Sequence, residues 1–263
     1  MIAVTLQEFK LNIKNLLIWS LSVGILGFIC TLMYQSMEGD MMDMADQFSK
    51  MGAFSDAFGM STLSIATLPG FFATEVGTVH GLGSALFSAF LASCLLSKEE
   101  DGHTGEFLFS LPVSRWKVVT AKAIALLTHL VLFTVICGAF YFLAFAYLGE
   151  DIPTKDMMIF LFGMLLMNIE IGAISYLFSS ISSKNRMGLG LGIALIFYSY
   201  DLIGRVVPSM KDYLFIGPFS YANASEIFAG KNAPEYSIII AVIVIIATFG
   251  GAYITYTKRD LAS

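Results

Sequence analysis

The sequence predicts an all-α membrane protein with six transmembrane helices, because of its composition, its long apolar blocks and its charge distribution. The 263 residues are 57% hydrophobic and only 13% charged, whereas soluble domains are roughly half apolar and about a quarter charged. The apolar residues form blocks of about 20 residues, which is the length that a helix needs to cross a ~30 Å hydrocarbon core. The net charge of −5 argues against nucleic-acid binding. Residues 1–263 are predicted to form a single transmembrane domain.

Six apolar blocks are the predicted spans. They cover residues 16–36, 76–97, 122–148, 157–182, 187–204 and 236–257. The sixth block contains YSIIIAVIVIIATFGGAYITY and is the most uniformly apolar. The fifth block is the shortest, and at its end Asp201 and Arg205 are spaced for a local salt bridge. Gly188 and Gly192, in the same block, have the spacing of a helix-packing pair rather than of a site.

The first residues are too polar to span a membrane but have helical periodicity. Apolar residues recur over 2–16, and most of the polar residues, including Glu8, lie elsewhere on the helical wheel. The pattern predicts an amphipathic helix over residues 2–14 that lies on the inner membrane surface. The alternative is an ordinary first turn that leads into the first span. The basic start and early apolar core of a cleaved signal peptide are not present.

Two long loops on the predicted outer side contain apolar stretches. Residues 37–75 are first acidic and rich in methionine, then apolar, with a break at Pro69-Gly70. Residues 205–235 include YLFIGPFSYANASEIFAG, which is too short to cross the membrane twice. Both loops are therefore candidates for re-entrant segments before spans two and six. Non-helical backbone at that depth must be shielded by protein or water.

The positions of lysine and arginine predict the orientation, because these residues concentrate on the cytoplasmic side. If both termini are cytoplasmic, ten of the 15 bases lie inside and five outside. The inside set is Lys10, Lys14, Lys98, Arg115, Lys117, Lys122, Lys184, Arg186, Lys258 and Arg259. The loop between spans two and three is therefore predicted to be cytoplasmic.

Metal and nucleotide sites are not predicted in this chain. Cys30, Cys94 and Cys137 lie inside apolar blocks, as expected of buried free thiols, and no Cys/His cluster has the spacing of metal ligands. Glu75 and His80 lack a third ligand. The sequence contains no G-x-x-x-x-G-K-[ST] loop for ATP phosphates. Any ATP-driven action therefore requires a separate chain.

The loop SKEEDGHTGEFLFSLPVSRWKVVTAK, residues 97–122, concentrates the organised polarity of the chain. Asp101 or Thr104 is placed to cap a short helix with Glu106 in its first turn. Apolar side chains follow, and Pro112 ends the segment. The pattern predicts a capped helix at the membrane surface that docks on a soluble partner. The alternative is a solvated loop whose bases follow the positive-inside rule.

The same loop resembles the cytoplasmic loop of ABC-2 type transporter permeases. The matching positions are Thr104, Glu106, Leu108, Leu111, Pro112, Ser114, Arg115 and Lys122. His103 departs from the family pattern, which usually has glycine before the threonine. The stretch IGPFSYANASEIF also resembles the Pro-Phe segment before the last span of these permeases. The resemblance extends over nearly the whole chain through the six-span layout.

The resemblance implies a permease subunit of an ATP-binding cassette exporter in a bacterial plasma membrane. Such a subunit has no enzymatic activity of its own. It pairs with a second permease, identical or related, and with two copies of a cytoplasmic ATPase that bind ATP and Mg. The implied substrate is hydrophobic or amphipathic: a peptide, an antibiotic or a lipid. The coupling residues that the resemblance implies are Glu99, Glu100, Thr104, Glu106, Phe107, Leu108, Leu111, Pro112, Ser114 and Arg115.

Glu170 stands near the middle of the predicted fourth span, where an acid is costly and is by default a functional hypothesis. Asn168 and Ser175 lie almost opposite it on the helical wheel, so we expect protein or a cavity on both sides of this span. His129 in span three is the candidate partner of Glu170. The alternative is a neutral Glu170 that is hydrogen-bonded inside the bundle and has only a structural role.

Two other classes compete with a permease. An intramembrane enzyme needs paired catalytic groups at one depth, but the three histidines are isolated, and GLGSA around Ser84 is not a nucleophile elbow. A stand-alone secondary transporter normally shows internal repeats and more paired ionisable residues at the midplane. Co-purification with an ATPase chain discriminates best among the three classes.

Overall fold

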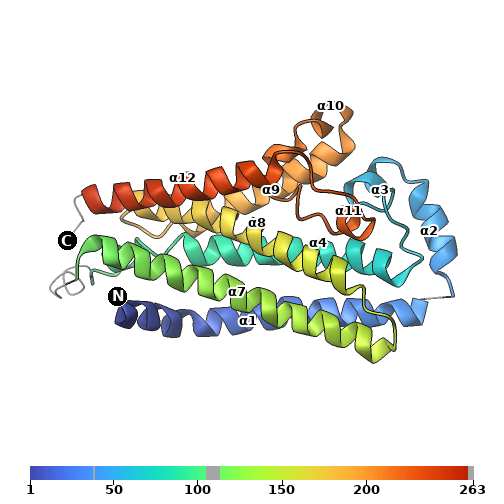
Figure 1. Ribbon diagram of the computed structural model, residues 1–263, viewed down its shortest axis with the longest axis horizontal. Coiled ribbons are helices and arrows are strands. Elements are labelled where there is room, and N and C mark those ends of the chain that lie inside the picture. Colours follow the sequence, from blue (N-terminus) through green and yellow to red (C-terminus); the bar gives the residue numbers. More distant parts are fainter. Residues whose placement is uncertain (38, 105–112, 260–263) are drawn as a thin grey trace.

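The computed structural model describes residues 1–37, 39–104 and 113–259, and this part of the chain is a helical bundle without strands. The long helices run side by side, and the start of α1 and the end of α12 lie at the same end of the bundle (Figure 1). The long helices are α1 Ile2–Met37, α4 Leu68–Ala92, α7 Arg115–Leu148, α8 Thr154–Ile181, α9 Met187–Val206 and α12 Ser237–Lys258. The short ones are α2 Met41–Ser49, α3 Ala53–Ala57, α5 Lys98–Asp101, α10 Pro208–Lys211, η1 Leu214–Ile216 and α11 Ala224–Phe228.

Five helices are long and apolar enough to cross a membrane, namely α1, α7, α8, α9 and α12. The predicted second span corresponds to α4, which is not among them. It carries Thr74, His80, Ser84 and Ser88, and all four are buried. They are shielded because α4 packs against α1, α8, α9 and α11. Five of the six predicted spans therefore correspond to helices long and apolar enough to cross a membrane, and a sixth crossing by α4 stays a prediction.

The N-terminal segment is part of α1 and not a separate helix, contrary to the prediction for residues 2–14. Residues 2–23 contain neither glycine nor proline, so nothing in the sequence interrupts the helix before the apolar block. The 36 residues of α1 extend over about 54 Å at 1.5 Å per residue, well beyond a ~30 Å hydrocarbon core. Glu8, assigned from the sequence to the polar face, is only 4% exposed.

The Pro69-Gly70 pair begins α4 instead of breaking the loop before it. Thr67 is the N-cap, and its hydroxyl accepts a hydrogen bond from the Gly70 amide at 3.2 Å. Proline is tolerated in a first helical turn because the amide that it lacks has no partner there. The helix therefore starts eight residues before the predicted span at residue 76. At the far end of α7, Gly149 ends the helix with a left-handed φ of 72°, as is common for glycine after a last turn.

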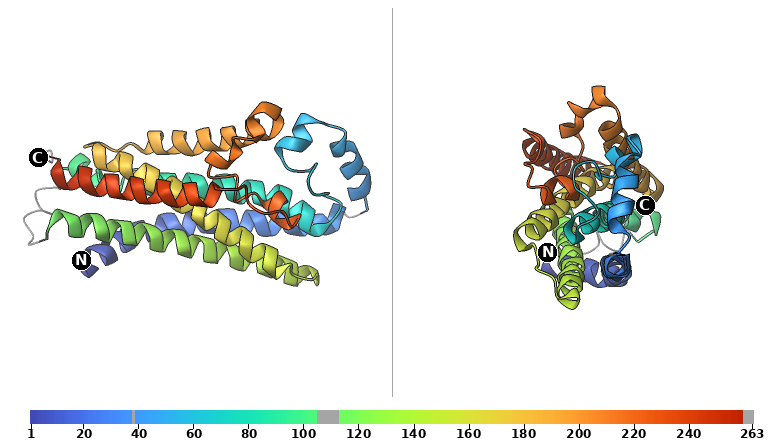
Figure 2. Two further views of the ribbon diagram at one scale, coloured as in Figure 1. Left: turned by 45° about the horizontal axis from the view of Figure 1, so that its top comes forward. Right: turned by 90° about the vertical axis from the view of Figure 1, so that its right-hand side faces the viewer.

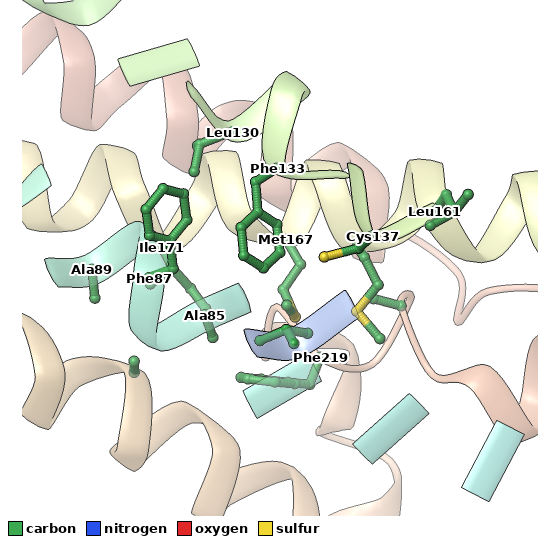
Figure 3. Packing of buried hydrophobic residues seen from close by; sticks show 14 of the residues in the cluster. Ala85, Phe87, Ala89, Leu130, Phe133, Cys137, Leu161, Met167, Ile171 and Phe219 are labelled. Atoms are coloured by element: carbon green, nitrogen blue, oxygen red, sulfur yellow. The ribbon is translucent and has the colours of Figure 1, made fainter. Parts of the chain in front are cut away.

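The core lies where α4, α7 and α8 meet, and their apolar side chains interdigitate (Figure 3). Phe87 of α4 stacks on Phe133 of α7 with ring centroids 4.9 Å apart. Met167 and Ile171 of α8 belong to the same buried cluster. Between membrane helices such close packing and hydrogen bonds replace the hydrophobic effect as the source of association.

The segment between α10 and α12 enters the bundle. Residues 217–222 are all buried. Their backbone passes so close to Gly163 of α8 that a Cβ there would lie 3.3 Å from the Tyr221 carbonyl oxygen. Gly163 is nine residues into α8, about 14 Å along its axis. Helices α2 and α3 instead lie at the end of the bundle away from both marked termini (Figure 2).

Two predictions for α9 have different outcomes. Asp201 and Arg205 form the expected salt bridge, with bonds of 2.8 and 2.9 Å. Gly188 and Gly192 do not pack inside the chain, because an added Cβ at either would meet no atom within 4 Å. Gly190 makes the contact with α4 instead, since it lies about 160° around the helix from either. The three cysteines are free, as expected, but only Cys137 is fully buried.

Candidate functional site

The site lies at the end of the bundle that holds the starts of α1 and α7, where the chain enters and leaves the predicted coupling segment. Glu99 and Glu100 belong to α5, and Thr104 follows it. Ser114 is the N-cap of α7, and Arg115 is its first residue. The remaining predicted coupling residues lie outside the described residues: Glu106, Phe107, Leu108, Leu111 and Pro112.

A fully buried lysine holds α5 against the long helices. The Lys122 ammonium lies 2.5 and 2.6 Å from the two carboxylate oxygens of Glu99, and it also donates to the Leu95 carbonyl. Its second acidic neighbour is Glu8 of α1, at 3.4 Å. Lys98 of α5 pairs with the other oxygen of Glu8 at 2.5 Å. Lys122 therefore joins α7 to both α5 and α1.

A second ion pair ties α5 to the C-terminal end of the chain. The Arg259 guanidinium, directly after α12, pairs with the carboxylate of Glu100 and donates to the Ile181 carbonyl at 2.8 Å. Arg115 donates to the Arg259 carbonyl oxygen at 2.6 Å. The two sides of the predicted docking segment are thus anchored to the same neighbour.

We call Glu8, Lys98, Glu99, Glu100, Lys122 and Arg259 the ion-pair cluster. It contains three acids and three bases, so its formal charges balance. The side chain of Lys122 is fully buried, and those of Glu8 and Glu100 are 5% and 1% exposed. Such burial carries a desolvation cost that only good pairing offsets. The cluster therefore specifies one arrangement of α5 rather than merely adding stability.

Hydrogen bonds from α8 fix the turn before α5 as well. The Ser179 hydroxyl accepts from the amides of Leu96 and Ser97 at 2.9 and 3.3 Å. The Cys94 thiol donates to the Asn185 amide oxygen at 2.9 Å. The turn and α5 thus form one unit with the ends of four long helices.

The backbone at His103 has a conformation that suits glycine, the residue usual before the threonine in the family pattern. Its φ is +52°, in the left-handed region where a side chain is disfavoured. The Gly102 and His103 amides donate to the Lys98 and Glu100 carbonyls, at 2.9 and 3.1 Å, and close the end of α5. Glycine suits such a position after a helix end. The chain forms this turn although histidine stands where the family usually has glycine.

Glu170 is buried, but its partner differs from the predicted one. The Tyr221 hydroxyl donates to its carboxylate at 2.7 Å. His129 instead contacts the Ala125 carbonyl at 2.7 Å and lies against the ring of Phe9, with centroids 4.8 Å apart. The His129–Glu170 pair was predicted because both residues lie at a similar depth in the membrane. The position of His129 around the axis of α7 instead turns its side chain toward α1.

Asn168 and Ser175 are fully buried opposite Glu170, so α8 has protein on both sides, as expected. The Asn168 carbonyl accepts from Ser88 at 2.6 Å, while its side-chain amide has no partner among the described residues. Neither of the two largest cavities described is lined by His129, Asn168, Glu170 or Ser175. His129, Asn168 and Glu170 instead contact neighbouring elements.

Sequence reasoning missed Glu8, Arg259 and Tyr221 as members of these sites. Glu8 and Arg259 lie far from the loop in sequence, and their pairing follows from the tertiary arrangement. The one signal for Glu8 in the sequence was that it is the only acid in α1. Tyr221 lay in the segment that was recognised as semi-apolar, but no pattern pointed from it to Glu170.

Comparison with known proteins bears on the whole chain. Within the described residues, no three His, Cys, Asp or Glu side chains are grouped so that they could hold a metal ion. No curated protein matches the chain significantly. The family model described as ABC-2 family transporter protein matches residues 2–261.

Proposed function

Because the chain belongs to the ABC-2 family of transporter proteins, we propose that it is the permease subunit of an ATP-driven exporter. ATP and Mg²⁺ bind to a separate cytoplasmic ATPase chain in this proposal. The observation that carries it is the ion-pair cluster together with the Arg115–Arg259 hydrogen bond. These contacts fasten both sides of residues 105–112 to α1, α7 and the end of α12. A segment anchored in this way can transmit a movement of a soluble partner to the helices of the bundle.

The proposed topology has six crossings, with α4 as the sixth. The start of α1 and the end of α12 share one end of the bundle (Figure 1), and only an even number of crossings brings the chain back to the same side. Five helices are long and apolar enough to span, and α4 runs beside them with Thr74, His80, Ser84 and Ser88 buried and its one acid, Glu75, exposed. A helix shielded by other helices does not need an apolar surface.

The proposed orientation places the ion-pair cluster in the cytoplasm. It follows from the ten bases against five that the positive-inside rule assigns to that side. The segment 217–222 then enters from the outer leaflet as a re-entrant segment. Its complete burial meets the requirement that non-helical backbone be shielded at membrane depth.

The transport unit in this proposal contains two permeases, identical or related, and two ATPase copies. Its substrate is hydrophobic or amphipathic, such as a peptide, an antibiotic or a lipid. The family match supports this assembly. Exposed apolar side chains along α12, including Ile243 and Ile246, supply a surface for lipid or for the second permease.

Reconstitution with the ATPase that co-purifies from native membranes tests the docking role. The variant Glu106→Ala/Leu108→Ala/Leu111→Ala removes one polar contact and two apolar anchors. Because a central anchor contributes about 2 kcal/mol or more, we expect roughly 30-fold weaker association or more. Substrate-stimulated hydrolysis and transport should fall with it.

The matched control is Glu150→Ala/Asp151→Ala, which removes two exposed acids at the opposite end of the bundle. It should leave association, hydrolysis and transport unchanged. Normal values of all three quantities in the triple variant would show that this stretch is an ordinary positive-inside loop and not a docking element.

A further inference from the structure

A polar cavity of about 330 Å³ lies at the end of the bundle away from the ion-pair cluster. It forms where the segment that contains α3 meets the end of α9, α10 and α11. The Thr62 hydroxyl bridges these parts by donating to the Glu226 carboxylate at 3.1 Å. The volume is at the lower end of the range for small-molecule pockets, about 300–1,000 Å³, so the cavity suits a compact polar group.

Both signs of charge line this cavity. The bases are Arg205, Lys211 and Lys231, and the acids are Asp56 and Glu226. Two of the bases are already paired, since Arg205 bonds Asp201 with two of its three nitrogens and Lys231 lies 2.9 Å from Glu226.

Lys211 and Asp56 are the two wall charges that make no ion pair within the described part of the chain. A ligand that supplies one anionic and one cationic group would satisfy both.

Two exposed tyrosines lie close in sequence to residues that line the cavity. Tyr213, beside η1, is 59% exposed, and Tyr236, at the start of α12, is 61% exposed. Tyrosine gathers at the level of the lipid head groups, because its ring is apolar and its hydroxyl polar. Since Lys211 and Leu214, on either side of Tyr213, line the cavity, its occupant is drawn from that layer.

We propose that this cavity binds the phosphoethanolamine head group of a phospholipid. Arg205 and Lys211 bind the phosphate through charge-assisted hydrogen bonds, and Asp56 and Glu226 accept from the primary ammonium, which has three donors. A phosphocholine head group has no N–H to donate, and a phosphoglycerol head group has no cation for Asp56. The proposal concerns this outer site alone and does not depend on the docking of an ATPase.

Native mass spectrometry of the purified full chain in detergent tests the proposal with three lipids that share the same acyl chains. The phosphoethanolamine lipid should bind more tightly than the phosphocholine and phosphoglycerol lipids. Lys211→Ala should weaken its binding by about fivefold, the value of one exposed ion pair. Asp56→Ala should shift the preference toward the phosphoglycerol lipid.

Lys155→Ala is the matched control, because Lys155 is an exposed lysine at the same end of the bundle that does not line the cavity. Its lipid binding should equal that of the unaltered chain. Equal binding of the three lipids, or an equal loss in the control, would overturn the proposal. Free glycerophosphoethanolamine should compete weakly, and competition as strong as that of the lipid would assign the site to a soluble zwitterion instead. Thermal unfolding without lipid confirms that each variant is folded.

Discussion

At the scale of single residues, the hydrogen bond with Tyr221 determines which side chains can replace Glu170. The acid is 3% exposed and accepts from the Tyr221 hydroxyl. This bond connects the middle of α8 to the inserted segment 217–222. A carboxylic acid and an amide of equal size can accept the same bond, whereas an aliphatic side chain leaves the tyrosine hydroxyl buried without a partner.

Replacement of Glu170 separates hydrogen bonding from ionisation. Glu170→Gln should unfold at nearly the same temperature as the unaltered protein in detergent. Glu170→Leu should lose about 1–3 kcal/mol of stability because of the orphaned hydroxyl, and adding Tyr221→Phe should restore part of it. A stable Gln variant that no longer transports would show that ionisation is required. Unchanged stability in Glu170→Leu would show that the Glu170–Tyr221 hydrogen bond does not stabilise the protein.

At the scale of elements, α5 is a four-residue helix that cannot be stable alone. Helices shorter than about 12 residues are marginal in water, so α5 depends on its partners. Those partners are the buried Lys122, the acid Glu8 and the guanidinium of Arg259. The predicted coupling segment therefore follows a short helix that α1, α7 and the end of α12 hold in place.

Lys122→Met should destabilise the protein by about 3 kcal/mol, because it leaves the Glu99 carboxylate without its buried partner. Lys122→Met/Glu99→Gln should recover much of this loss, since no unpaired charge remains and Glu8 still has Lys98. Thermal unfolding of the two single variants and the double variant gives the coupling energy. Strictly additive losses would mean that the Lys122–Glu99 pair does not hold α5.

At the scale of the whole molecule, the two ends of the bundle differ in kind. One end holds the ion-pair cluster, the starts of α1 and α7 and the end of α12. The other holds α2, α3, α10 and the polar cavity (Figure 1). The long helices between them expose many large apolar side chains, as a surface in contact with lipid requires.

Cysteine labelling tests the proposed orientation of these two ends. In a chain whose native cysteines are replaced, single cysteines at the exposed positions Ser114, Asp46 and Asn232 should differ in access to an impermeant reagent. Asp46 and Asn232 should react in intact cells, and Ser114 only after permeabilisation, because the bases concentrate on its side. Labelling of Ser114 from outside would exclude contact with a cytoplasmic ATPase.

The sequence by itself determined the helical membrane class, the presence of the long helices and the polarity of the loop after α4. These features depend on the composition of segments of about 20 residues or fewer, such as the uniformly apolar block within α12. The Asp201–Arg205 bridge is local in the same sense, since four residues on a helix fix its geometry. The family resemblance of the loop agrees with the match over residues 2–261.

Only the tertiary structure decided which polar groups meet. Glu8 and Lys122 are 114 positions apart, and Tyr221 reaches Glu170 across 51. Such contacts depend on how each helix is rotated about its axis, and a rotation is fixed by packing against every neighbour at once. For the same reason α4 can carry buried polar side chains such as His80 and Ser84 in the centre of the bundle, because what surrounds a helix decides which of its side chains are shielded.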